Sequence, residues 1–189
     1  MKKKIVYIAL VLSLIVNSVL IYSHIENAKK LNISWSNSIG KLASSIALST
    51  IQPSLLEKLD VSTLSNAKQS LEILVAQLAG LQMLPEGVKI ISPTTMGKFS
   101  EVTNYEHVLI TKIEKDINSS KKISSNDFEQ LSKINKAWEK MLATLGKKRN
   151  EINPFSPIFQ GEQWKAVLDD ASKELDGLNL GPLPDNSPW

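Results

Sequence analysis

The sequence contains no cysteine, and this absence excludes several kinds of site. Without a thiol the chain can form no disulfide, no thiolate–metal centre and no cysteine nucleophile. A lipoprotein anchor is excluded as well, because the lipid would have to be attached to a cysteine. A cysteine-free domain outside the cytoplasm suits a bacterial envelope protein.

Familiar catalytic signatures are missing too. The sequence has no HExxH, GxSxG, Walker or GxGxxG pattern. It has two histidines, His24 and His107, and neither has a second metal ligand at helical spacing. We therefore predict no catalytic residue, no metal site and no bound cofactor.

Charge is balanced over most of the chain, although the formal net charge is +3. Lys2, Lys3 and Lys4 account for this excess, so the remaining chain is neutral overall. Nucleic-acid binding needs a clustered basic surface. We therefore predict no nucleic-acid partner.

The charges are nevertheless unevenly distributed. Residues 120–150 contain eight Lys or Arg and three acids, whereas residues 151–189 contain seven acids and two Lys. Two interpretations remain open: each segment has a solvated charged face, or the acidic C-terminal segment folds back onto the basic helix.

A long apolar run stands at the beginning of the chain. Ile5 to Ser23 includes no charged residue, no proline and no glycine. About 20 residues at about 1.5 Å each span the hydrocarbon core of a bilayer. The lysines at 2–4 favour a cytoplasmic N-terminus and an extracytoplasmic remainder, and Lys29 and Lys30 on the other flank make this bias modest. We predict a single-pass protein of the cell membrane.

A cleaved secretory signal is the alternative to an uncleaved anchor. Signal cores have 7–15 apolar residues and small residues before the cut. This run is longer, and Ile21 stands where a small residue is preferred, so the uncleaved anchor is favoured over a secreted helical protein. Only four residues precede the run, and we expect that a membrane partner would carry any signal inward.

Three small or polar residues share one face of the predicted anchor. Ala9, Ser13 and Asn17 are four residues apart. Small residues allow close helix approach in lipid, and an Asn amide can hydrogen-bond across to a neighbour. This face is a candidate for self-association or for a membrane partner, although an isolated anchor also tolerates such residues.

Helical periodicity predicts an all-α fold. Apolar stripes cover residues 28–46, 64–81, 99–117 and 128–145. The first stripe continues the anchor without a break and should end near Gln52, because Pro53 disfavours a helical residue before it. Short connections predict an antiparallel four-helix bundle. The predicted division is a tail and anchor at 1–27, a bundle at 28–150, and an acidic appendix at 151–189 with a helix near 162–176.

Local signals predict several details of this bundle. Ser92 and Ser124 are expected N-caps, and Gly146 is expected to end the fourth helix. Ile73 and Val75 widen the apolar face of the second helix, so we expect that helix to lie deep in the bundle.

Glu106 is the residue that interrupts an apolar seam. Helical geometry places it between Val102 and Leu109, facing the core. A buried carboxylate must be paired, protonated or near the end of the bundle. Glu106 is therefore a candidate ligand-binding or proton-responsive acid, and the alternative is a structural pair with a lysine of the bundle.

The C-terminal tail has three prolines in its last eight residues and should be extended. Its last residue, Trp189, is a candidate recognition residue for the groove of a partner. The alternative is a tail that is loose or packed locally.

Two functions from different classes follow. The favoured one is a non-enzymatic binding module, sensory or scaffolding, that is displayed outside the cell. It would bind a protein partner, a second copy, or a small ligand between its helices. The other is an envelope enzyme or enzyme accessory that uses carboxylates such as Glu101 and Glu106. Those two residues are not on one helix face, which weakens the second hypothesis.

Overall fold

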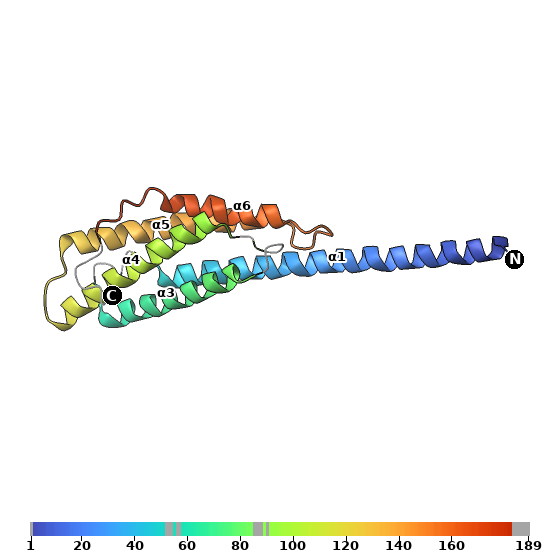
Figure 1. Ribbon diagram of the computed structural model, residues 1–189. Coiled ribbons are helices and arrows are strands. Elements are labelled where there is room, and N and C mark those ends of the chain that lie inside the picture. The colour runs from blue at the N-terminus through green and yellow to red at the C-terminus, as the bar shows by residue number, and fades with distance from the viewer. Residues whose placement is uncertain (1, 52–54, 56–57, 85–88, 90, 183–189) are drawn as a thin grey trace.

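The computed structural model describes residues 2–51, 55, 58–84, 89 and 91–182, with side chains from Tyr7 onward. All of the regular structure in these residues is helical, as predicted (Figure 1). The elements are α1 (Lys2–Ser49), α3 (Val61–Gln82), α4 (Pro93–Asn118), α5 (Ser125–Asn150), α6 (Gly161–Ser172) and the 3-10 turn η2 (Lys173–Leu175).

Helix α1 has two halves with different surroundings. Its 48 residues contain neither proline nor a run of glycines, so nothing interrupts the backbone between the apolar run and the following stripe. The side chains of residues 7–24 are exposed, and in Figure 1 this half projects away from the other helices. Trp35, Ile39 and Leu42 in the second half are buried. The helix ends at Ser49, close to the predicted end.

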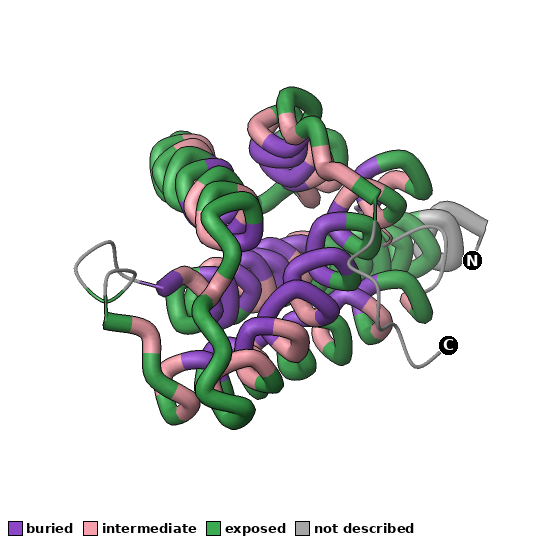
Figure 2. Tube along the Cα trace, turned by 90° about the vertical axis from the view of Figure 1, so that its left-hand side faces the viewer, coloured by how far each residue is buried: buried purple, intermediate pink, exposed green. Residues whose placement is uncertain are grey.

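The second half of α1 forms an antiparallel four-helix bundle with α3, α4 and α5. Successive helices run in opposite directions (Figure 1), and each contacts two of the others, α1 with α3 and α5, α4 with α3 and α5. The buried faces of these helices are turned toward one another, as Figure 2 shows looking from the end far from the N-terminus. The predicted bundle is therefore confirmed.

The helix starts follow the capping signals. The Ser92 side chain accepts a hydrogen bond from the Thr95 backbone N–H at 3.1 Å, and the Ser124 side chain accepts one from Asp127 at 3.0 Å. Each cap satisfies an amide that has no partner within the helix. Both predicted N-caps are confirmed.

The predicted end of the fourth helix at Gly146 is wrong, because α5 continues to Asn150. A glycine ends a helix by adopting a positive φ, and none of the described glycines has one. The last turn contains Lys147, Lys148 and Arg149, whose charges favour a helix C-terminus. The Nε of Arg149 also donates to the Ser36 hydroxyl at 3.2 Å, which ties this turn to α1.

The expectation that α3 lies deep in the bundle is also wrong. Ile73 and Val75 are 47% and 48% exposed. Among the described residues α3 packs mainly on α1 and α4, whereas α6 adds a further layer on α4 and α5, so only the narrow seam of α3 is covered. The seam residues that are buried are Leu64, Ala67, Leu71, Leu74, Leu78 and Leu81.

The C-terminal segment does fold back onto α5, which decides between the two interpretations of the charge pattern. Helix α6 lies along α5 and α4 and adds Trp164 and Leu168 to the same core as the bundle. Lys148 pairs with Asp170 at 3.6 Å on the surface. Such a pair contributes about 1 kcal/mol at most, whereas burying one large apolar side chain contributes about 1.5–3 kcal/mol. Apolar burial therefore holds α6 in place.

The loop between α5 and α6 is fixed to α1 by one side chain. Asn32 is fully buried. Its Nδ2 donates to the backbone carbonyls of Ser156 (3.3 Å) and Ile158 (2.9 Å). Its Oδ1 accepts from the Gln160 backbone N–H (3.0 Å) and from Trp164 Nε1 (3.1 Å). Both N–H groups and the carbonyl oxygen of the Asn32 amide are thus hydrogen-bonded, and these bonds set the position of the loop beside α1.

Candidate functional site

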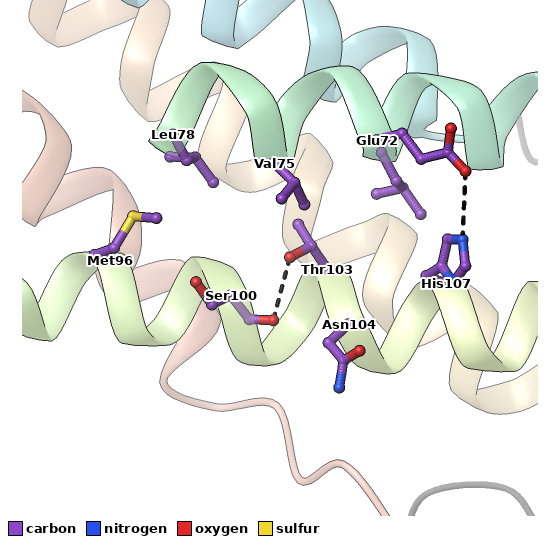
Figure 3. A pocket seen from close by; sticks show the side chains of 9 residues that line it. Glu72, Val75, Leu78, Met96, Ser100, Thr103, Asn104 and His107 are labelled. Carbon is purple, nitrogen blue, oxygen red and sulfur yellow. Dashed lines mark hydrogen bonds and ion pairs between the residues drawn. The ribbon is translucent and has the colours of Figure 1, made fainter. Parts of the chain in front are cut away.

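A groove of about 340 Å³ lies between α3 and α4. Its apolar part is formed by Leu71, Val75 and Leu78 of α3 and by Met96 of α4. Val75, Leu78 and Met96 are drawn in Figure 3, where they lie between the two helices. The partial exposure of Val75 is thus the consequence of a hollow on this side of α3.

The other part of the groove is polar. Ser100, Asn104 and His107 lie along α4, and Glu72 faces His107 from α3 (Figure 3). The His107 Nε2 and Glu72 Oε1 atoms are 3.7 Å apart, and both side chains are substantially exposed. This pair is weak by its distance and exposure, so Glu72 remains able to accept a hydrogen bond or a cation from a ligand.

Ser100 and His107 of the groove do not form a nucleophile–base pair. Ser100 and His107 are seven residues apart on one helix, which separates them by about 10 Å along the axis. A serine nucleophile needs a base within hydrogen-bonding distance. The groove therefore offers an apolar floor with a polar edge, an arrangement typical of recognition sites.

Glu106 lies on the side of α4 that faces the core. Its side chain is fully buried, and its Oε2 accepts a hydrogen bond from Trp138 Nε1 of α5 at 2.6 Å. Its Oε1 has no hydrogen-bonding partner among the described residues. Burial raises the pKa of Glu106 to about 8, and the Trp138 hydrogen bond opposes this shift. The acid is therefore protonated near neutral pH.

The alternatives for Glu106, an edge position or a pair with a lysine of the bundle, are both wrong. Its partner is the neutral indole of Trp138. Lys112, one and a half turns further along α4, instead pairs with both carboxylate oxygens of Asp127, at 2.9 and 2.7 Å. Sequence spacing places Glu106 in the core, but the spacing within α4 carries no information about which α5 side chain meets it.

The other residues singled out in the sequence are not brought together. Ala9, Ser13 and Asn17 lie on the exposed half of α1. Glu101 is exposed, so it lies apart from the buried Glu106. Trp189 falls outside the described residues. No group of three or more potential metal ligands occurs in the part of the chain that the structure describes.

Two residues that matter in the structure were missed in the sequence. Glu72 joins the groove only because α3 and α4 pack together, and no local pattern shows this. Asn32 did leave a signal, since it lies one turn from both Ala28 and Ser36 on the buried side of α1. Leu31, which belongs to the predicted apolar stripe at 28–46, is only partly buried, whereas Asn32 is buried.

The buried acid predicts a specific dependence of stability on pH. The folded chain holds a proton on Glu106 up to about pH 8, whereas the unfolded chain, with a pKa near 4.5, releases it earlier. The contribution of Glu106 to stability should therefore be fully present below pH 4.5 and fall as pH rises toward 8, by at most about 1.4 kcal/mol per pH unit. Glu106→Gln cannot ionise and keeps an oxygen for Trp138, so its profile should lack this slope.

The measurement is urea denaturation of the full chain in detergent micelles at pH 5, 7 and 9. Glu101→Gln serves as the control, because that side chain is exposed, and it should retain the slope of the natural chain. Equal pH profiles for the natural chain and Glu106→Gln would contradict the assignment of a raised pKa to Glu106.

Comparisons of the chain with protein-family models, with curated proteins and with solved structures gave no match. The geometry of this chain is therefore what supports the function proposed below.

Proposed function

We propose that this chain is a single-pass membrane protein whose helical bundle acts outside the cytoplasm as a non-enzymatic binding module. The observation that carries the proposal is the exposed N-terminal half of α1. It is long and apolar enough to cross a membrane, and none of its most apolar stretch is buried against the rest of the chain. The same helix continues into the core of the bundle, so the bundle is attached rigidly to the span.

This continuity supports an uncleaved anchor over a cleaved signal. Helix α1 passes Ser23 without a break and remains helical to Ser49. A signal peptidase prefers small residues before the cut, and Ile21 occupies one of these positions. The lysines at 2–4 favour the orientation with the N-terminus in the cytoplasm.

The groove between α3 and α4 is the surface that we assign to binding. It lies between two antiparallel helices and extends along α4 from Met96 to His107, about 16 Å at the rise of a helix. A row of apolar side chains along such a groove fits an amphipathic helix with apolar anchors at i and i+3 or i+4. The occupant is therefore a helical segment of a protein partner, with a cationic or donor group that meets Glu72.

The buried and separated carboxylates favour this binding function over an enzyme. Glu106 does not line the groove between α3 and α4, and Glu101 is on the surface. A carboxylate pair for acid–base chemistry would have to face one substrate from a short distance.

The orientation can be tested with cysteine labelling, because the natural chain has no cysteine. Ser125→Cys, at the exposed start of α5, should react with a membrane-impermeant maleimide in intact cells. Lys3→Cys should react only after the cells are permeabilised. Labelling of Lys3→Cys alone in intact cells, or release of the labelled bundle without its anchor, would contradict the proposal.

The groove can be tested with a photo-crosslinking amino acid at Val75 in chains expressed in the native membrane. We expect a discrete crosslinked protein, and we expect Ser100→Arg to reduce its yield several-fold by filling the groove. Ile73 provides the matched control, since it has almost the same exposure on the same helix but does not line the groove. A crosslink of equal strength from Ile73, or none from Val75, would refute the groove as the binding surface.

A further inference from the structure

The loop between α5 and α6 carries apolar side chains that the bundle does not cover. Phe155 is 67% exposed and Ile158 is 70% exposed. No charged residue occurs from Ile152 to Gly161, although Glu151 and Glu162 stand at the two ends. An uncharged loop with two exposed large apolar side chains is unusual on a surface that faces only water.

The exposure of these side chains does not come from a loosely formed loop. Asn153 Oδ1 accepts a hydrogen bond from the Phe155 backbone N–H at 3.0 Å, and the Ser156 hydroxyl accepts one from Ile158 at 3.2 Å. The Asn32 side chain binds the carbonyls of Ser156 and Ile158. The loop is therefore held in one shape that presents Phe155 and Ile158 outward.

The position of the loop along α1 shows what these side chains meet. Figure 1 shows the loop extending beside α1 toward the N-terminus, beyond the end of α3. Asn32, which holds the loop, is nine residues past Ser23, about 13 Å along the helix axis. The interfacial layer of a bilayer is about 5–8 Å thick on each side. Subtracting the thickness of the interfacial layer from the distance of about 13 Å between Ser23 and Asn32 leaves a gap that about two extended residues can cover.

The short stretch of α1 between Ser23 and Asn32 is partly covered on one side. Ala28 is 3% exposed, and Ile25 is half-buried, although Tyr22 is 67% exposed. The protein cover on α1 therefore ends close to Ser23, the last residue of the apolar run. The contacts of α1 with the rest of the protein therefore stop directly beside the apolar run that we propose to lie in lipid.

We propose that Phe155 and Ile158 insert into the headgroup layer of the same bilayer that α1 crosses. The inference rests on the membrane span proposed above and adds a second contact of the bundle with the membrane. Large apolar side chains at the boundary between headgroups and acyl chains are stable there, and the absence of charge removes the cost of bringing the loop to that depth. Two contacts on one side of the bundle fix its tilt relative to the membrane.

The test uses the full chain in vesicles of phosphatidylcholine and phosphatidylglycerol. Pro157→Cys, at an exposed position between the two apolar residues, carries an NBD fluorophore, and nitroxide lipids quench it from within the bilayer. We expect quenching several-fold stronger than at Leu48→Cys. Leu48 is also exposed, at 69%, but lies near the other end of α1. Adding Phe155→Ser and Ile158→Ser should reduce the quenching at 157 to that at 48.

A third probe separates failure of this inference from failure of the membrane span. Leu12→Cys lies within the apolar run and should be quenched most strongly of all. Quenching at 12 with none at 157 would overturn the loop contact alone, and absence of quenching at 12 would overturn the anchor as well. A blue-shifted but unquenched probe at 157 would mean that a second copy covers the loop, which also overturns the proposal.

Discussion

One unbroken helix has to satisfy two different surroundings, and the rest of the structure depends on it. The first half of α1 is apolar on every side and is exposed, whereas the second half is amphipathic and buries Ile39, Leu42 and Ile46 completely. In lipid every backbone amide must be satisfied within the helix, which an unbroken helix achieves. In the bundle the same helix supplies one wall of the core. Any change in the direction of the span is therefore transmitted to the bundle.

The polar groups in the core show how this rigid connection is completed. Asn32 makes three hydrogen bonds to the α5–α6 loop and one to Trp164 of α6, and Arg149 binds Ser36 one turn further along α1. Gly40 allows this contact, because its missing side chain leaves room for the Arg149 guanidinium. Both contacts lie in the half of the core nearest the exposed half of α1. They join α1 to the C-terminal part of the chain. Helix α6 itself packs mainly on α5.

Much of the fold could be predicted from the sequence because it follows from local periodicity. The stripes in α3 and α4, and the caps at Ser92 and Ser124, depend only on residues a few positions apart. Errors arose where distant contacts decide the outcome. Gly146 stays helical because the α5 C-terminus has Arg149 to dock on α1. Val75 stays exposed because, in the part of the chain that the structure describes, α6 packs on α4 and α5 rather than on α3.

The candidate site was less accessible to sequence analysis than the fold. The inward direction of Glu106 follows from its place between Val102 and Leu109, yet its hydrogen bond to Trp138 depends on the register of α4 against α5. The groove combines residues from two helices, and its polar edge appears only when Glu72 and His107 meet. Phe155 and Ile158 were not singled out in the sequence, because their outward presentation depends on the contact of the loop with Asn32.

The most direct test of the central claim is the distance between two spin labels on α1 in a bilayer. Labels at Val16→Cys and Leu48→Cys, both exposed positions, are 32 residues apart. A continuous helix predicts a single narrow distribution near 48 Å, at about 1.5 Å per residue. A broad or markedly shorter distribution would show a hinge between the span and the bundle, and the account of a rigidly anchored binding module would be contradicted.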